Sequence, residues 1–396
     1  MSPFAKRFFA TRTPEEFKEL SRGVVYRHPV RTAILSQIGF WIIANCLFLL
    51  TVWQVLYRAS FIYPQVIIPP LGVMLTAACV SAIIYGAVLG GVDVLLTSWL
   101  SGDLPLGLRI LIKTVIYTAV LVAVMFVVVN GLRLLVGENY AERHGMIAGT
   151  KTGFGFLWVL VPYALVCNTL MSALKQIDAS FGPGVLPAML LGRYRRPVRE
   201  HRVFMFMDLR SSTKYAEQLG HERYSAMIRD LFSGMDEAIR RYDAEVYQYI
   251  GDEVVFTWNS EKGTRDHRCL LFFFAIEDII RARRDHYVSQ YGLVPEFKAG
   301  LHLGEVTTVE IGTIKREIAY HGDAVNTAAR IQGLCNSMER TVLISDEVLR
   351  ACGALCNVPV RTEDLGSVLL KGKATPTFVH AVSRTGGLNT TKPPHR

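Results

Sequence analysis

Hydrophobic residues are concentrated in four long runs in the first half of the chain. Each run is longer than the roughly 20 apolar residues that a helix needs to cross a bilayer. The second run has prolines near its start and glycines near its end, and small residues of this kind allow helices to pack closely. We therefore predict an α-helical transmembrane bundle of about four helices, at 32–56, 66–92, 114–136 and 153–174.

The stretch between the second and third runs, 93–113, is more polar, and we expect a connecting segment with some interfacial helix there. We expect no cluster of ionisable residues inside the apolar runs that would mark an ion path. The bundle is then either a plain anchor that pairs two chains or a sensor whose packing responds to a ligand. A third possibility is a transporter, but the four apolar runs lack internal polar groups and give it little support.

After residue 201 the pattern changes to short apolar segments separated by turns. The alternating residues of 202–207 predict a strand, and 246–258 predicts two strands around the turn Gly251-Asp252. Apolar residues at helical spacing predict a core-facing helix that contains Tyr224, Met227, Ile228, Leu231, Phe232, Met235, Ala238 and Ile239. We further expect a helix at 266–287, a strand at 296–302, a strand pair at 305–320 and a helix from near Asp323. This order predicts an α+β fold with a mostly antiparallel sheet.

The charge distribution indicates how the chain is oriented. The 396 residues are 51% hydrophobic and carry a formal charge of +9. Basic residues gather just before the first apolar run and just after the last, which predicts cytoplasmic termini for a multi-pass protein of the inner or plasma membrane. The positive charge is then a property of the membrane flanks, so we expect no nucleic-acid partner. The seven cysteines lack metal-type spacing and suit reduced, structural thiols.

Two carboxylates stand where predicted strands end. Asp208 follows the strand 202–207, and Asp252 lies at the tip of the hairpin. Pairing of these strands brings both carboxylates to one sheet edge, where they can bind a pair of divalent cations. With FMDL at 206–209, GD at 251–252 and NTAAR at 326–330, the chain resembles the catalytic domain of the class III nucleotidyl cyclases, of the membrane-bound adenylate cyclase type.

The resemblance runs from about 202 to 383 and implies a ferredoxin-like fold that converts ATP to 3′,5′-cyclic AMP and pyrophosphate. It implies two Mg²⁺ or Mn²⁺ ions per site, held by Asp208, Asp252 and the backbone carbonyl of Leu209. Ser212 and Thr213, at a loop-to-helix junction, can bind the triphosphate, although a plain use as helix N-caps fits them equally well.

Asn326 and Arg330 are four residues apart and therefore share one face of a helix. Arg330 can bind phosphate oxygens and Asn326 can orient the ribose, and the resemblance implies that both stabilise the transition state. It implies that Lys371 contacts the terminal phosphates. It also implies a homodimer with two composite sites, in which one subunit supplies the metal carboxylates and the other supplies these three residues.

The positions that select the base depart from the family. Adenylyl-type members usually carry Lys where this chain has Gln248, and Asp or Thr where it has Ala319; guanylyl-type members carry Glu and Cys. A glutamine amide can pair with adenine or, flipped, with guanine. We favour ATP because the guanine-selecting carboxylate is absent, and keep guanylate cyclase and an inactive nucleotide-sensing receptor as alternatives. A diguanylate cyclase fits less well, because IGDEV at 250–254 lacks the first glycine and the phenylalanine of that family's hairpin.

The chain is thus predicted to have five parts. They are a cytoplasmic lead-in (1–31), a transmembrane region (32–174), a transducing linker (175–201), a catalytic domain (202–383) and a disordered tail (384–396).

Overall fold

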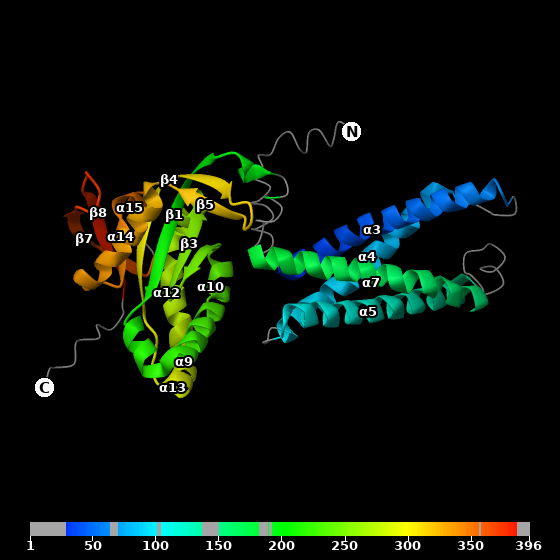
Figure 1. Ribbon diagram of the computed structural model, residues 1–396, viewed down its shortest axis with the longest axis horizontal. Coiled ribbons are helices and arrows are strands. Elements are labelled where there is room, and N and C mark those ends of the chain that lie inside the picture. Colours follow the sequence, from blue (N-terminus) through cyan, green and yellow to red (C-terminus); the bar gives the residue numbers. More distant parts are fainter. Residues whose placement is uncertain are drawn as a thin grey trace. The chain divides into compact units, whose positions relative to one another are not determined.

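The computed structural model of the protein describes residues 29–63, 70–100, 104–136, 150–181, 189, 192–355 and 358–385. These residues form two compact units (Figure 1). We call the described part of 27–186 the helical unit and the described part of 187–396 the α/β unit. Each unit has its own hydrophobic core.

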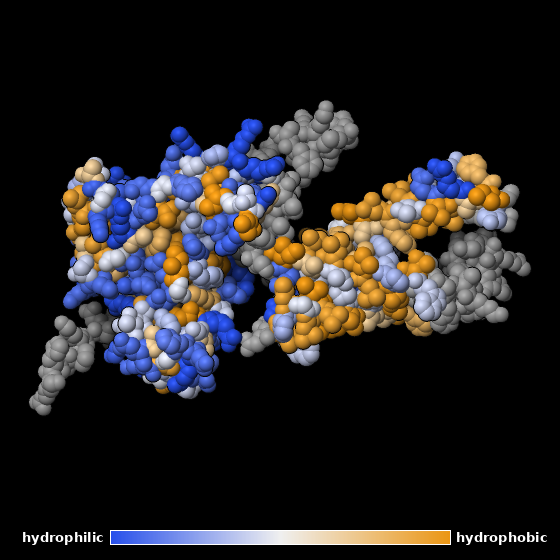
Figure 2. Space-filling model, viewed as in Figure 1, coloured by the Kyte–Doolittle hydropathy of each residue, from blue (hydrophilic) through white to orange (hydrophobic). Residues whose placement is uncertain are grey.

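Four long helices make up the described part of the helical unit. All four are long and apolar enough to cross a bilayer, and hydrophobic side chains cover much of their outer surface (Figure 2). The prediction of about four apolar helices is confirmed, whereas their insertion in a membrane stays a prediction. Part of the second predicted run, 66–69, lies outside the described residues. The helices are α3 (Pro29–Ser60), α4 (Leu71–Trp99), α5 (Leu106–Val136) and α7 (Thr150–Phe181).

Glycines of α4 allow α3 to approach closely. A Cβ atom at Gly86 would lie 2.8 Å from the Cα atom of Ile38, and one at Gly90 would lie 2.5 Å from the Cα atom of Ile34. The two glycines are one turn apart and form a flat stripe on α4. This is the close packing of small residues that the sequence indicated for the second run.

The stretch 93–113, expected as a connecting segment with some helix, is helical over most of its length. Helix α4 continues past Asp93 as far as Trp99, and α5 begins at Leu106. The charge of Asp93 within α4 is balanced by partners from neighbouring helices.

An ionic cluster surrounds Asp93 inside the helical unit. The carboxylate is 6% exposed and lies 3.1 Å from Nζ of Lys113 on α5 and 2.5 Å from Nζ of Lys175 on α7. The hydroxyl of Tyr117 also donates a hydrogen bond to it. A buried carboxylate is tolerated only with such partners. The three charged residues stand just outside the predicted apolar runs, at 93, 113 and 175, and the helices bring them together although they are far apart in the sequence.

One eight-stranded sheet forms the centre of the α/β unit (Figure 1). The strand order is β2-β3-β1-β4-β6-β8-β7, and β5 pairs with β4. The strands are β1 (Val198–Leu209), β2 (Glu245–Ile250), β3 (Glu253–Asn259), β4 (Phe297–Ile311), β5 (Glu317–His321), β6 (Val342–Ser345), β7 (Val360–Val368) and β8 (Thr377–Arg384).

The sheet is mixed, which corrects the expectation of a mostly antiparallel one. Strand β6 runs parallel to β4, while the other strand pairs are antiparallel. The cause is helix α14 (Asp323–Ser337), through which the chain returns from β5 before it forms β6. A helical connection of this kind sets two strands parallel.

Side chains of β1 alternate between two cores. Val203, Met205 and Met207 face the larger core, together with the buried residues of the predicted helical stripe, Met227, Leu231, Met235, Ala238 and Ile239. Phe204 and Phe206 face the other core, together with Ala324 and Ala328 of α14. The helices of the larger core are α9 (Ser212–Gly234), α10 (Asp236–Arg241), α12 (Arg268–Ala282), α13 (Arg284–Tyr291) and α15 (Asp346–Cys352).

Three short elements complete the unit: the 3₁₀ turns η1 (Arg193–Arg195) and η2 (Arg265–His267), and helix α11 (Ser260–Thr264). The helix expected at 266–287 is divided into α12 and α13, and the strand expected at 296–302 is the first part of the longer β4. Local pattern thus located these elements but not their ends.

Candidate active site

Acidic residues lie together where strand β1 ends and strand β3 begins, and we call this border of the sheet the carboxylate edge. Strands β1 and β3 are antiparallel neighbours, and Asp208 at the end of β1 lies opposite Glu253, the first residue of β3. Asp252 directly precedes Glu253 in the turn after β2. Gly251 in that turn has a φ of 65°, a left-handed conformation that favours glycine. The structure therefore brings Asp208 and Asp252 to the same edge, next to Leu209 at the end of β1.

The carboxylate of Asp208 is held through one of its oxygens. Oδ2 lies 3.1 Å from Nζ of Lys298 on β4 and accepts a hydrogen bond of 3.1 Å from Nε2 of Gln332 on α14. Among the described residues no hydrogen bond or ion pair involves Oδ1, so this oxygen remains available to a ligand. Sequence analysis missed both partners. A lysine inside an apolar strand was a signal for Lys298, whereas nothing distinguished Gln332.

The carboxylates at this edge influence one another. Burial raises the pKa of Glu253 to about 7, and the charges of Asp208 and Asp252 contribute to the rise, while Lys298 acts in the opposite direction. Excess negative charge thus accumulates at the edge, which is the electrostatic condition that attracts cations.

Tyr224 belongs to this edge as well as to the core stripe in which the sequence placed it. The residue is half-buried, and its hydroxyl interacts with Ser212 and Asp252. Burial is the main cause that raises the pKa of Tyr224, and the charge of Asp252 is the next. The tyrosine connects the first turn of α9 to the carboxylate edge.

Ser212 and Thr213 are the first two residues of α9. The residue in the cap position is Ser211, with a φ of 57°, and no side chain caps this helix end. The N-cap alternative for Ser212 and Thr213 is therefore wrong. Their backbone N–H groups belong to the first turn of a helix, where such groups favour anions.

Arg330 lies against the loop that joins β7 to β8. A Cβ atom at Gly372 would be 3.5 Å from Nη2 of Arg330, and Gly372 directly follows Lys371. The loop is attached to the start of α14 by an ion pair of 2.8 Å between Lys373 and Asp323. The loop that carries Lys371 and Lys373 therefore lies beside α14.

The comparisons with known proteins agree on this unit. The sequence profile of the family described as "Adenylate and Guanylate cyclase catalytic domain" matches residues 198–382. Adenylate cyclase 2 of Rhizobium meliloti (strain 1021) is 39% identical over 211 residues, which are 53% of this chain and 58% of that protein. Adenylate cyclase 1 of the same organism is 28% identical over 192 residues, 46% of this chain and 28% of that protein. Residues 198–382 belong to the class III nucleotidyl cyclase family.

The chain spans little more than half of the first relative and less than a third of the second. Among solved structures, the adenylyl cyclase CyaB from P. aeruginosa matches 48% of this chain and 96% of its own, with 20% identity and a TM-score of 0.42. The family model and the relative at 39% identity confirm the family resemblance inferred from the sequence, for residues 198–382, which we call the cyclase domain.

The cyclase domain of one chain holds its predicted site residues in two groups. Asp208, Asp252 and Ser212 lie at the carboxylate edge. The other group is on and beside α14, where Asn326 is exposed and Arg330 is half-buried. Among the residues that the structure describes, no hydrogen bond or ion pair joins Asp208 or Asp252 to Asn326, Arg330 or Lys371.

The two predicted base-reading positions lie on different strands of the cyclase domain. Gln248 is exposed on β2, and Ala319 is 7% exposed on β5. Of these two side chains only that of Gln248 has polar atoms, so Ala319 can form no side-chain hydrogen bond with a base.

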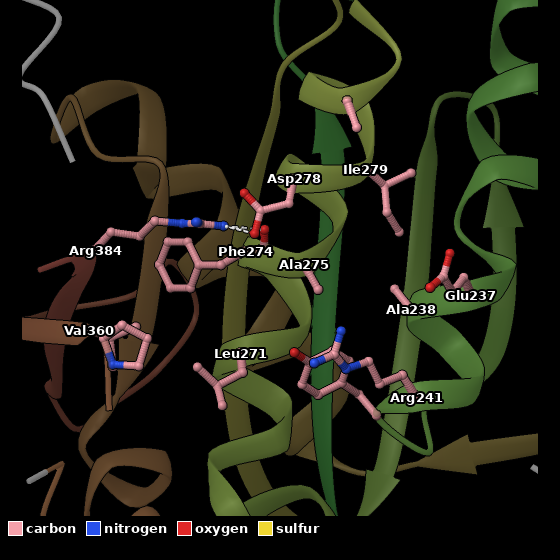
Figure 3. Close-up of a pocket in the computed structure, with 13 residues that line it drawn as sticks. Glu237, Ala238, Arg241, Leu271, Phe274, Ala275, Asp278, Ile279, Val360 and Arg384 are labelled. Carbon is pink, nitrogen blue, oxygen red and sulfur yellow. Dashed lines mark hydrogen bonds and ion pairs between the residues drawn. The ribbon is translucent and has the colours of Figure 1, made fainter. Parts of the chain in front are cut away.

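A groove of about 380 Å³ opens elsewhere on the cyclase domain, among α10, α12 and the ends of β7 and β8 (Figure 3). Arg384 extends along it to Asp278, at a distance of 2.7 Å. The groove includes none of the predicted site residues.

Proposed function

We propose that the chain is an adenylate cyclase that converts ATP to 3′,5′-cyclic AMP and pyrophosphate. The observation that carries this proposal is the meeting of Asp208 and Asp252 at one edge of a domain of the cyclase family. The relative named adenylate cyclase 2, at 39% identity, supports ATP as the substrate.

In the proposed reaction the ribose 3′-oxygen attacks the α-phosphorus. The bond from the α-phosphorus to the oxygen that bridges to the β-phosphate breaks, the proton of the 3′-hydroxyl passes to solvent, and pyrophosphate leaves. Little covalent chemistry falls to the protein, so catalysis depends on positioning and on neutralising charge.

Asp208, Asp252 and the backbone carbonyl of Leu209 are the proposed ligands of two Mg²⁺ or Mn²⁺ ions. Their oxygens suit these hard cations, which usually take one or two carboxylates and complete their shell with water and substrate phosphates. Bound cations would lower the pKa of the attacking hydroxyl and neutralise the triphosphate. Lys298 and Gln332 fix Oδ2 of Asp208 and so orient Oδ1 for ligation.

The remaining residues bind and orient the nucleotide. Ser212 and Thr213 offer backbone N–H groups and hydroxyls to the triphosphate. Asn326 orients the ribose, Arg330 stabilises the charge that develops at the α-phosphate, and Lys371 binds the terminal phosphates.

The proposal includes a homodimer in which each site takes its metal carboxylates from one chain and Asn326, Arg330 and Lys371 from the other. The match of 198–382 to the family model supports this arrangement, which is general for that family. It also includes a multi-pass anchor in the inner or plasma membrane at 32–174, a cytoplasmic catalytic domain at 202–383, and the flanking parts 1–31, 175–201 and 384–396. Four candidate spanning helices support the anchor.

Product formation by the purified full-length protein tests this function. ATP and GTP are each supplied with Mg²⁺ or Mn²⁺, and Asp252→Asn is compared with Asp285→Asn, an exposed carboxylate on α13. Cyclic AMP should form, Asp252→Asn should lose at least about 100-fold in rate, and Asp285→Asn should be unaffected.

Cyclic GMP as the main product would make the chain a guanylate cyclase with the same mechanism. Nucleotide binding without any cyclic product, in detergent and in membranes, would instead indicate a nucleotide-sensing receptor and overturn the proposal.

A further inference from the structure

If the chain is the cyclase proposed above, strands β2 and β5 carry its base-reading positions. Ala319 on β5 has no polar side-chain atom, and among the described residues no hydrogen bond holds the amide of Gln248 on β2. An amide that is free to turn can pair with either purine. Discrimination between the bases must therefore depend on how the two strands are placed.

A bulge in β2 turns the chain next to Gln248. The ladder between β2 and β3 skips Tyr247, which is therefore an extra residue on β2. Bulges redirect side chains and are common beside active sites. Here the ring of Tyr247 packs against the ring of Tyr320 on β5, with centroids 4.9 Å apart and planes at 70°.

The contact between the two rings joins the neighbours of both base-reading positions. Tyr247 directly precedes Gln248, and Tyr320 directly follows Ala319. In the sheet, β3, β1 and β4 stand between β2 and the strand β5. The tyrosine pair therefore forms a long-range link across the sheet face that also carries Phe204.

One guanidinium fixes this link from inside the sheet. Arg202 of β1 is 3% exposed, and its Nη2 lies 2.6 Å from Oε2 of Glu245 on β2. Its guanidinium carbon lies 5.0 Å from the centre of the Tyr320 ring on β5. The other nitrogens are also bound, since Nη1 lies 3.1 Å from Glu200 and Nε donates to the Thr257 hydroxyl at 3.1 Å. A planar group bound on all sides has a single position.

We propose that Arg202 is a positioning residue for base selection. It holds Glu245 of β2 and Tyr320 of β5 on one guanidinium and thereby sets the separation between Gln248 and Ala319. A purine that pairs with the amide of Gln248 binds productively only if it also fits the space between Gln248 on β2 and Ala319 on β5.

The same network extends to the segment that leads into β1. Glu200, which binds Arg202, also lies 3.2 Å from Nη2 of Arg193 and accepts a hydrogen bond of 3.4 Å from the hydroxyl of Tyr194, both in η1. Glu200 is 6% exposed and Tyr194 is 1% exposed. A displacement of η1 therefore reaches the base-selecting strands through two buried side chains.

The test compares Arg202→Lys with Arg340→Lys in the full-length protein. Both substitutions keep the charge and remove a planar guanidinium that is bound to a carboxylate. Arg340 donates to both carboxylate oxygens of Glu363 on β7, which lies at the opposite end of the strand order from β2. We measure kcat and KM for ATP and for GTP. Arg202→Lys should lower the ratio of kcat/KM for ATP to that for GTP by about 10-fold or more, chiefly through a higher KM for ATP, and Arg340→Lys should leave the ratio unchanged.

A loss of rate that is equal for both nucleotides in Arg202→Lys would overturn the proposal, because a merely structural role lowers both alike. If Arg202→Lys does not fold, Tyr320→Leu removes the ring and leaves the ion pairs, and the same change in ratio is expected. Calorimetric affinities for non-cyclisable ATP and GTP analogues separate the two hypotheses. An inactive wild-type protein would refute the proposed function, while an unchanged ratio of analogue affinities in the variant would refute the role of Arg202.

Discussion

Replacement of Gly300 by alanine is expected to disable the site by moving α14. Gly300 lies on β4 beneath this helix, and a Cβ atom there would be 2.1 Å from the backbone nitrogen of Gln332 and 2.5 Å from its Cα atom. Both obstacles are backbone atoms of a helix, so no rotamer change relieves the overlap.

The size of the effect follows from these distances. Non-bonded atoms need about 3.5 Å, so the helix must move by roughly 1 Å, and overpacking of this kind destabilises by about 1–3 kcal/mol. Helix α14 carries Asn326 and Arg330, and its Gln332 holds Asp208, so the shift misplaces both groups of site residues. A displacement of about 1 Å can reduce a catalytic rate by about 100-fold.

The assay measures cyclic AMP formation and the thermal unfolding midpoint of Gly300→Ala in detergent, with Gly333→Ala as the matched control. Gly333 is also on α14, but an added Cβ atom there meets nothing within 4 Å. Alanine favours a helix over glycine by about 1 kcal/mol, so the control should keep full activity and equal or greater stability. Normal activity and an unchanged midpoint in Gly300→Ala would refute the reasoning.

Two further predictions concern buried charges. Burial lowers the pKa of His302 below 6.5, although Glu347 acts in the opposite direction. As the pH falls below about 6.5, the unfolded chain takes up a proton that the folded chain does not. Acid should therefore destabilise the wild type more than His302→Gln, and identical stability profiles between pH 5 and 7 would contradict this. In the helical unit, Asp93→Asn leaves Lys113 and Lys175 without their carboxylate and should lower the thermal midpoint, while addition of Lys175→Met should recover part of the loss; a double variant no more stable than the single one would count against the cluster.

Local pattern in the sequence was sufficient for much of the fold. The alternation along β1 and the Gly251-Asp252 turn located three strands, and antiparallel pairing of β1 and β3 then brought Asp208 and Asp252 together. The helical stripe from Met227 to Ile239 predicted which face of α9 and α10 is buried. Each of these conclusions depends on a period or a turn that neighbouring residues determine.

Long-range contacts were beyond the sequence pattern. Gln332 bonds Asp208 across 124 positions, and Lys175 reaches Asp93 across 82. The parallel placement of β6 depends on the path of α14 over the sheet, which no local period records. For the same reason Arg202, which reads as an ordinary residue at the start of a strand, gave no signal of its place between β2 and β5.

Activity of a mixed dimer tests the central claim most directly. Asp252→Asn and Arg330→Ala chains with different tags are expressed together, and the dimers that carry both tags are purified. In such a dimer one composite site has both defects and the other has none, because a two-fold pair exchanges the same surfaces. The account predicts cyclic AMP formation at about half the wild-type rate per dimer, from two parents that are each inactive. A mixed dimer as inactive as its parents would contradict it.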